Sequence, residues 1–320
     1  MKATWDRRDF GRTAALGLGA LALRGLSAQT SASPKDSQRP KKIKIGVSTL
    51  AWNVSPNSTD TFEQALKDIS ELGYSGFETV SPMIEALDAS GAMAKLMDKY
   101  HISMKAGYLG TNVTDPALRR ENVAKAISVG KLIRKYGGTY CVIAVNGRRA
   151  PGRGPNQPDT FNFQEHKADI VASLNEYGMA LTDLGLGVGL HQHTGTVVET
   201  RDEVYGTMEA VNTRYMKFAP DVGQLQKGGA DAAKVVRDFA GITTHMHLKD
   251  YSNGKYMAGY CPLGMGFVDL ESILNTLEDA GNNPDVMYEL DRGNAPMSAR
   301  DTAEFGKAHL IRLGYRFPMT

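Results

Sequence analysis

The chain has 320 residues, of which 42% are hydrophobic and 22% are charged, and its formal net charge is +2. This composition is typical of a globular protein and excludes a disordered or collagen-like chain. The near balance of charge gives no electrostatic support for a nucleic-acid partner. Two cysteines, Cys141 and Cys261, are too few for a disulfide scaffold.

The first 28 residues are similar to an export signal. Paired arginines at positions 7 and 8 precede a weakly apolar stretch over residues 14–23, which is too short to span a membrane, and residues 26–28 have the small side chains of a cleavage site. The pattern resembles a twin-arginine signal, so we expect export to the periplasm; an ordinary Sec signal or an uncleaved anchor is the alternative. Residues 29–42 are expected to form a flexible tether.

Beyond this tether, short β-rich segments alternate with amphipathic helical segments. The expected strands cover residues 43–48, 76–80, 102–107, 140–145, 187–193, 216–220, 243–249 and 286–290. The expected helices cover residues 61–72, 89–100, 115–136, 163–184, 200–211, 230–239, 270–280 and 299–313. Glycines such as Gly73 and Gly281 stand where these helices should end.

Eight strand–helix repeats without a break in composition predict a single α/β domain over residues 43–320, folded as a (β/α)8 TIM barrel. A doubly wound α/β sheet is the alternative. In a barrel the chemistry takes place at the C-terminal ends of the strands, so the polar residues at these ends are the first candidates for a functional site.

The last four expected strands all end in side chains that can bind metals. These side chains are His191 and His193 on the fifth strand, Asp221 after the sixth, His245 and His247 on the seventh, and Glu289 and Asp291 on the eighth. Residues i and i+2 of a strand face the same way, so both members of a pair can point into the barrel. Because barrel interiors are normally filled by Val, Ile and Leu, this pattern predicts a metal site. Its nitrogen and oxygen ligands favour Mn²⁺, Co²⁺, Zn²⁺ or Fe²⁺ over Mg²⁺.

Several segments resemble those of a known family. They are Ile45-Gly46-Val47-Ser48-Thr49, Gly76-Phe77-Glu78, Asp221-Val222-Gly223, His247-Leu248-Lys249-Asp250, Pro262-Leu263-Gly264-Met265-Gly266 with Val268-Asp269, and Glu289. In this order they are similar to the xylose-isomerase-like barrels, often labelled sugar phosphate isomerases/epimerases, over about residues 43–315. The segment His191-Gln192-His193-Thr194-Gly195-Thr196 is similar to one found in the inosose dehydratases of that family.

The resemblance implies one divalent metal ion held by residues from strands five to eight. Carried over to this chain, the ligands are His191, Asp221, His247 and Glu289. His193 and His245 are then their neighbours in the site. Lys249 and Asp250 are implied to be a site lysine and its partner, although an ion pair on the barrel rim is the alternative.

The chain departs from the family pattern at two positions. The epimerase branch has Glu where this chain has His191, and uses that Glu with the strand-eight Glu as two opposed acid–base groups. Only Glu289 of that pair remains here. Many relatives also have His where this chain has Gln224. A nuclease of the endonuclease IV type is disfavoured, because it needs a larger ligand set for three metals.

The expected reaction follows from these residues. A metal on a ketone oxygen polarises the carbonyl and stabilises the enolate that forms when the neighbouring proton leaves. The candidates for proton transfer are Glu289, His193, His245 and Lys249, and the candidates for substrate contact are Trp52, Glu78 and Asp291. We expect β-elimination from a non-phosphorylated keto sugar, keto-glycoside or keto polyol. The alternatives are sugar isomerisation or epimerisation by 1,2-proton transfer, and a non-catalytic periplasmic sugar-binding protein.

The expected partner is therefore a small sugar molecule. No nucleic acid and no membrane span after signal cleavage are expected, and assembly into a homo-oligomer stays open.

Overall fold

The computed structural model describes residues 40–146, 161–291 and 295–318. The predicted signal, residues 1–28, and most of the predicted tether lie outside the described residues. Within the described ranges, no helix has the length and apolar character needed to cross a membrane.

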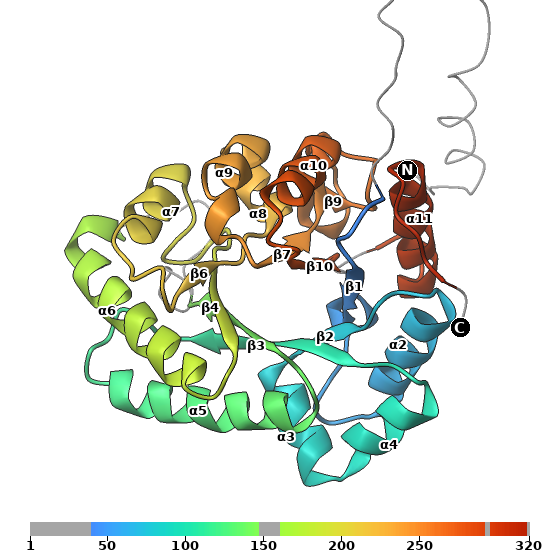
Figure 1. Ribbon diagram of the computed structural model, residues 1–320, viewed down its shortest axis with the longest axis horizontal. Coiled ribbons are helices and arrows are strands. Elements are labelled where there is room, and N and C mark those ends of the chain that lie inside the picture. The colour runs from blue at the N-terminus through green and yellow to red at the C-terminus, as the bar shows by residue number, and fades with distance from the viewer. Residues whose placement is uncertain (1–39, 147–160, 292–294, 319–320) are drawn as a thin grey trace, which may run out of the picture. The chain divides into compact units, whose positions relative to one another are not determined.

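Eight parallel strands form a nearly closed barrel, with helices between them on the outside (Figure 1). The strands are β1 (Ile45–Ser48), β2 (Phe77–Val80), β3 (Met104–Thr111), β4 (Tyr140–Val145), β5 (Gly187–His191), β6 (Lys217–Phe218), β7 (His245–Leu248) and β10 (Asp285–Tyr288). Their order around the sheet is β6-β5-β4-β3-β2-β1-β10-β7. The prediction of a (β/α)8 TIM barrel is confirmed.

The barrel closes between β6 and β7 at a seam with little regular pairing. Two isolated parallel bridges cross it, from Phe218 to Thr243 and from Asp221 to His247. The backbone N–H of His247 donates to the carbonyl of Pro220 at 2.8 Å. Strand β6 has only two residues, so the seam depends on these few contacts.

Helices lie in all eight places where amphipathic patterns are found. They are α2 (Asp60–Glu71), α4 (Ala92–Lys99), α5 (Arg119–Lys135), α6 (Phe163–Thr182), α7 (Arg201–Met208), α9 (Ala232–Asp238), α10 (Leu270–Ala280) and α11 (Ala299–Arg312). In α2 the side chains of Phe62, Leu66 and Ile69 are buried, which is the spacing of one helix face. At the start of α7 the side chains of Thr200 and Glu203 form a capping box.

Some elements were not expected from the sequence. They are α3 (Ser81–Ala89), α8 (Val222–Lys227), the antiparallel pair β8 (Asp250–Tyr251) and β9 (Tyr260–Cys261), and the short 3-10 helices η1 (Thr49–Trp52), η2 (Ala240–Ile242) and η3 (Met257–Gly259). Strand β5 was expected to end at residue 193 but ends at His191, and β7 was expected to end at residue 249 but ends at Leu248. Both differences place polar residues just beyond a strand end.

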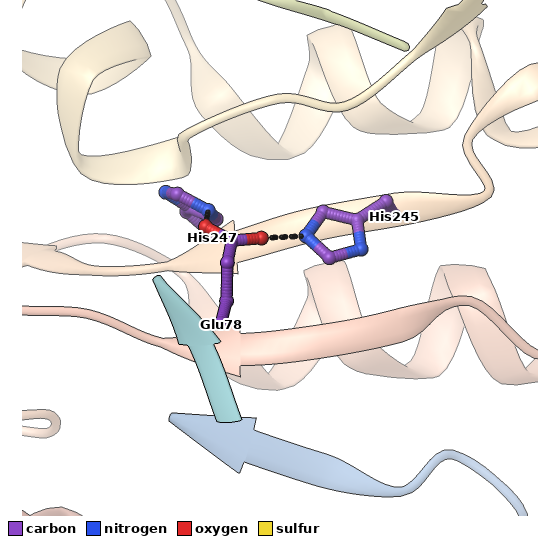
Figure 2. Close-up of side chains that lie close together, drawn as sticks. All are labelled: Glu78, His245 and His247. Atoms are coloured by element: carbon purple, nitrogen blue, oxygen red, sulfur yellow. Dashed lines mark hydrogen bonds and ion pairs between the residues drawn. The ribbon is translucent and has the colours of Figure 1, made fainter. Parts of the chain in front are cut away.

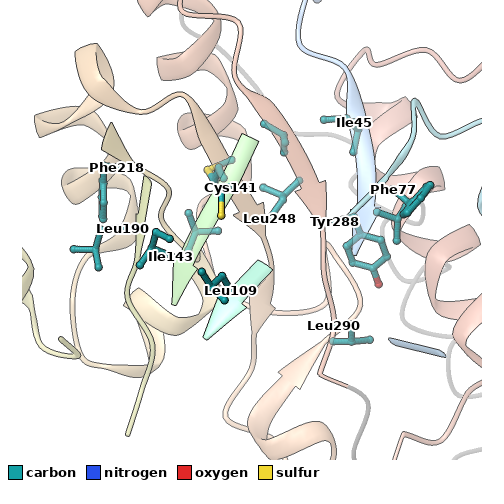
Figure 3. Close-up of a cluster of buried hydrophobic side chains, with 14 of the residues drawn as sticks. Ile45, Phe77, Leu109, Cys141, Ile143, Leu190, Phe218, Leu248, Tyr288 and Leu290 are labelled. Carbon is teal, nitrogen blue, oxygen red and sulfur yellow. The ribbon is translucent and has the colours of Figure 1, made fainter. Parts of the chain in front are cut away.

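The larger apolar cluster includes side chains from strands all around the barrel (Figure 3). Ile45, Leu109, Leu190 and Leu248 all belong to it, together with buried residues of the surrounding helices. A second, smaller cluster consists of Ala106, Tyr140, Val142 and Ala219. The hydroxyl of Tyr140 lies 3.0 Å from the hydroxyl of Thr244, and its ring stacks on His245 at 4.7 Å.

Candidate metal centre

Four buried side chains from strands five to eight of the barrel come together. His191, Asp221 and His247 each offer one ligand atom, and these atoms lie within 4.8 Å of one another. Glu289 Oε2 lies 3.1 Å from His247 Nδ1. None of the four residues is more than 3% exposed. The four ligands implied by the family resemblance therefore occupy one place in the fold.

His191 is the last residue of β5, and its imidazole is oriented by the backbone just after β6. Its Nδ1 lies 3.2 Å from the carbonyl oxygen of Ala219, to which it can donate, so that Nε2 keeps its lone pair. Burial is the main cause that holds the pKa of His191 well below its ordinary value, and the charge of the nearby His247 is the second. This imidazole is therefore neutral, which is the form that binds a metal.

The two carboxylate oxygens of Asp221 have different partners: one caps a helix and the other faces Lys249. It is the N-cap residue of α8, and its Oδ1 accepts the backbone N–H of Gln224 at 2.9 Å. Its Oδ2 lies 2.8 Å from Lys249 Nζ. Burial raises the pKa of Asp221, against the opposing effect of the Lys249 charge.

The carboxylate of Glu78 is shared by the two histidines of β7 (Figure 2). Its Oε1 lies 2.6 Å from His247 Nε2, and its Oε2 lies 2.8 Å from His245 Nε2. Burial alone would raise the pKa of Glu78, but the two imidazoles lower it to about 2. Because His247 donates through Nε2, its Nδ1 is left facing Glu289.

Lys249 follows β7 and is completely buried among acidic side chains. Its Nζ lies 2.7 Å from Glu289 Oε1, 2.8 Å from Asp221 Oδ2 and 3.1 Å from Asp291 Oδ2. Burial lowers the pKa of Lys249, but the attraction of Asp221, Asp291 and Glu289 outweighs burial and raises it well above the ordinary value. Lys249 is therefore a permanent positive charge in the site.

The donor set fits a divalent cation. Within the described residues, none of the buried atoms His191 Nε2, Asp221 Oδ2, His247 Nδ1 and Glu289 Oε2 has a conventional hydrogen bond; the last three have only ionic contacts, Asp221 with Lys249 and His247 with Glu289. Such atoms are rare in folded proteins, because each costs free energy when it is left unsatisfied. Two imidazole nitrogens and two carboxylate oxygens suit Mn²⁺, Co²⁺, Zn²⁺ or Fe²⁺. His245 Nδ1 shares this lack of a hydrogen bond but belongs to a residue that pairs with Glu78.

Next to this cluster, His193 and Asp291 are partly exposed and are joined by Gln224. The amide oxygen of Gln224 accepts the hydroxyl and backbone N–H of Thr194 and the hydroxyl of Tyr260. Its amide nitrogen therefore faces His193 Nε2 at 2.6 Å and Asp291 Oδ2 at 3.3 Å. His193 Nδ1 lies 2.8 Å from the carbonyl oxygen of Thr194. This pattern is satisfied by a neutral His193 with its proton on Nδ1.

Asp250 does not partner Lys249, contrary to the expectation from the family resemblance. Its two oxygens accept the backbone N–H groups of Gly264, Gly266, Val268 and Tyr251 at 2.8 to 3.2 Å. A side chain on Gly266 would overlap the Asp250 carboxylate, which explains the glycine in this loop. Neighbouring residues point to opposite sides of an extended chain, so Lys249 and Asp250 cannot both face the barrel interior.

Trp52 contacts the helix α2. Its indole N–H donates to Asp68 Oδ2 at 2.8 Å, and the residue is only 5% exposed. Asp68 lies on α2, so this contact joins η1 to the neighbouring helix. The structure thus places Trp52 in the packing between elements.

Two aromatic residues near the cluster were not expected as site residues. The ring of Tyr108 meets His191 edge-on at 5.2 Å and stacks with His247 at 6.0 Å. The alternation of side chains along β3 could have identified it, because Tyr108 follows the inward Ala106 by two residues. Tyr260, whose ring lies 4.9 Å from Lys249 Nζ, belongs to the unexpected strand β9 and had no such signal.

Comparisons with known proteins point to one family. Residues 66–309 match the family described as the xylose isomerase-like TIM barrel. The chain is 20% identical over 291 residues to an inosose dehydratase of Clostridium botulinum, which covers 84% of this chain and 96% of that protein. It is 25% identical over 216 residues to an inosose dehydratase of Geobacillus kaustophilus, covering 65% and 69% respectively.

Solved structures support the same fold. The IolI protein, whose structure has a bound zinc atom, superposes with a TM-score of 0.68 at 17% identity and covers 87% of this chain and 100% of its own. A D-allulose 3-epimerase of Methylomonas sp. gives 0.66 at 18% identity, covering 86% and 99%. The probable 3-DHS dehydratase AsbF of Bacillus anthracis gives 0.64 at 16% identity, covering 84% and 99%.

Proposed function

The chain belongs to the xylose isomerase-like TIM barrel family, and from this premise we propose that it is a divalent-metal-dependent enzyme that eliminates a β-oxygen from a keto sugar, keto-glycoside or keto polyol. Its relatives include inosose dehydratases, a probable 3-DHS dehydratase and an epimerase. The chain is accordingly an enzyme that acts on carbohydrates. The choice of elimination is argued below from the residues of the site.

The observation that carries the proposal is a group of four buried ligand atoms, of which His191 Nε2 has no partner among the described residues and the other three have only ionic contacts there. His191 Nε2, Asp221 Oδ2, His247 Nδ1 and Glu289 Oε2 would hold the metal. A divalent cation bound there would polarise the carbonyl of a substrate and make the neighbouring C–H more acidic. With His191 in the ligand set, its lone pair is used for binding, so His191 does not accept a proton from the substrate.

We assign the proton acceptor to His193. Among the four histidines of strands five and seven, His193 alone is partly exposed, whereas His191, His245 and His247 are fully buried. Its Nε2 carries the lone pair and is held by the amide of Gln224. Rotation of that amide would free Nε2 to accept a proton.

The leaving oxygen also requires a proton. The imidazolium formed at His193 is an acid, so it can return its proton to an oxygen on the same face of the substrate. One residue then serves both steps of an elimination. Epimerisation needs a second group on the opposite face, and the carboxylate that serves this purpose in the epimerase branch is replaced by His191. This difference favours elimination over the alternative of isomerisation or epimerisation.

The other candidates receive different roles. Glu78 and His245 are fully buried and bonded to each other, so we assign them to orienting His247 and not to contact with substrate. Asp291, whose side chain is 35% exposed beside Lys249, remains a candidate for binding a substrate hydroxyl. Trp52, held by Asp68, is assigned to packing.

The test is a reaction followed by NMR in deuterated buffer. The purified protein, loaded with Mn²⁺, is incubated with an inosose and, separately, with D-allulose. We expect loss of water from the inosose, exchange of the proton next to its carbonyl, and no reaction after treatment with EDTA. His193→Gln should abolish exchange while still binding Mn²⁺. Exchange with inversion of a carbon centre and no loss of water would instead establish epimerisation.

We also propose that the protein is exported by the twin-arginine route, on the basis of its first 28 residues. Replacement of Arg7 and Arg8 by Lys should keep the full-length chain in the cytoplasm. Unchanged export of the variant would point to the Sec route.

A further inference from the structure

We propose that Lys249 is a fixed internal cation that sets how tightly the site binds a divalent metal. It offsets the mutual repulsion of three carboxylates; it orients one of the two that belong to the ligand set and competes with the metal for the other. The inference rests on the proposed function, because it concerns the same metal site. It assigns Lys249 a positioning role in addition to any contact with substrate.

The first argument is the set of contacts made by the ammonium group. Lys249 Nζ donates to Glu289 Oε1 at 2.7 Å and to Asp291 Oδ2 at 3.1 Å, and it lies 2.8 Å from Asp221 Oδ2. An ammonium has three N–H groups, so these three carboxylates account for its full capacity. Two of them, Asp221 and Glu289, are the acidic members of the ligand set.

The contacts with the two ligands differ. On Glu289 the lysine holds Oε1, and Oε2 is left directed toward His247. This contact fixes the orientation of the carboxylate. On Asp221 the lysine pairs with Oδ2, the oxygen that remains once Oδ1 accepts the N–H of the helix cap. Lys249 therefore orients one ligand and competes for the other.

The second argument is the space built for the lysine side chain. A Cβ atom on Gly223 would lie 2.7 Å from Lys249 Cγ and 2.9 Å from its Cβ, so Gly223 leaves room for the aliphatic part of the side chain. The ring of Tyr260 lies 4.9 Å from Nζ. Lys249 is among the largest side chains in the protein with no exposed surface. The position of the charge is thus fixed by packing on both sides.

The third argument is the charge of the group. Asp221, Glu289 and Asp291 contribute three negative charges when ionised, and Lys249 contributes one positive charge. A neutral side chain at position 249 would leave all three negative charges uncompensated, which strengthens the attraction for a cation and destabilises the protein in its absence.

The test compares Lys249→Met with the wild-type full-length protein. The Kd for Mn²⁺ is measured from the electron paramagnetic resonance of free Mn²⁺, and Tm is measured in EDTA and in saturating Mn²⁺. We expect the Kd of the variant to fall about tenfold or more. Its Tm should fall further in EDTA than in Mn²⁺.

The matched control is Lys227→Met. Lys227 also lies near the ring of Tyr260, at 4.7 Å, but its Nζ donates to the backbone carbonyl of Ala258. This variant should bind Mn²⁺ within about twofold of the wild type, because the lost charge is not hydrogen-bonded to a ligand.

A second variant keeps the inference testable if Lys249→Met does not fold. Gly223→Ala leaves the charge in place but displaces the lysine side chain, because Gly223 has no left-handed backbone angle and the nearest atoms all belong to Lys249. We expect a lower Tm in EDTA and a changed Kd for Mn²⁺. A Gly223→Ala variant with a higher Tm and an unchanged Kd for Mn²⁺ would overturn the inference, because alanine would then only have stabilised α8.

The remaining outcomes separate this inference from the proposed function. If the wild type binds Mn²⁺ while Lys249→Met shows an unchanged or higher Kd, the inference alone is overturned. If Tm falls equally with and without Mn²⁺, Lys249 has only a packing role, and the inference is again overturned. A wild-type protein that binds no divalent metal would overturn the proposed function and this inference together.

Discussion

Asp221 and Asp250 are buried aspartates from two regions of the molecule, the barrel seam and the short strand β8 that follows β7. The oxygens of Asp250 accept four backbone N–H groups, three of which belong to the glycine-rich segment 264–268 and hold it in place. Asp221 accepts one backbone N–H at Oδ1, and within the described residues its Oδ2 meets only the ammonium group of Lys249, at 2.8 Å. The same residue type is therefore saturated by the backbone in one region and left incomplete in the other.

This difference shows how the partners of a buried carboxylate distinguish its roles. The four backbone N–H groups stabilise the ionised form of Asp250 and fasten a loop, so its contribution is to the fold. In the described part of the chain the Oδ2 of Asp221 has no backbone partner, and Asp221 lies with His191 and His247 in the candidate ligand set, so its contribution is to binding. Both residues are 1% exposed or less, so burial alone does not separate the two roles.

The largest expected effect is at the incomplete carboxylate. Asp221→Asn retains an oxygen for the cap of α8 but loses the negative charge offered to the metal. We expect activity to fall about a thousandfold and Mn²⁺ binding to be lost, with Tm within a few degrees of the wild type. The matched control is Asp231→Asn, because Asp231 caps α9 through an equivalent bond to Lys234 N at 2.9 Å. Equal loss of activity in both variants would contradict the comparison.

The second effect is expected at the saturated carboxylate. Asp250→Ala leaves four backbone N–H groups without their acceptor, so we expect the free energy of unfolding to fall by about 3 kcal/mol or more, measured in denaturant. Asp269→Ala, which removes a single cap bond to Ser272 N, should lower it by about 1 kcal/mol. If Asp250→Ala lowered activity while leaving stability unchanged, the assignment of Asp250 to the fold would be wrong.

A third, smaller effect is expected at Glu78, a buried carboxylate that is not itself a ligand but orients the ligand His247. Glu78→Gln replaces one of the two acceptors shared by His245 and His247 with a donor. His247 would then be less firmly oriented, and we expect the Kd for Mn²⁺ to rise about 10- to 100-fold. Competition with a chelator of known affinity measures this change. An unaltered Kd would mean that the strand alone orients His247.

The smallest effect is expected at Trp52, which the sequence suggested as a substrate contact. Trp52→Phe keeps the aromatic packing and removes the hydrogen bond to Asp68, so we expect a loss of about 1 kcal/mol in the free energy of unfolding and an unchanged KM. Tyr108→Leu serves as the comparison, because that ring contacts the imidazoles of the cluster. A KM that rises for Trp52→Phe and not for Tyr108→Leu would return Trp52 to the site.

The barrel and the strand ends could be predicted from local patterns. The alternation of β-rich and amphipathic segments indicated eight repeats, and the periodicity of two along a strand correctly placed His245 and His247 on one side of β7. The rule does not apply to His193, because β5 ends at His191; the rings of the two histidines nevertheless lie 6.2 Å apart. The rule also cannot bring Lys249 and Asp250 together, since they are consecutive residues.

Other features depend on contacts between distant residues, which a sequence pattern does not contain. Glu78 lies more than 160 residues from the histidines that it joins, so its role could not be read from β2 alone. The hub formed by Gln224 likewise joins segments around residues 193, 260 and 291. Helix α3 was missed because the expected helix began at residue 89, so that residues 81–88 were assigned to no element.

The weakly paired seam between β6 and β7 has a consequence for local opening. Asp221 and His247 face each other across it, joined by a single bridge, and both belong to the ligand set. A cation bound to both would tie the two sides together without adding a backbone hydrogen bond. In hydrogen-exchange experiments, the amide of His247 should therefore be protected far more strongly with Mn²⁺ than with EDTA, while amides in the long β3–β4 pairing should change little.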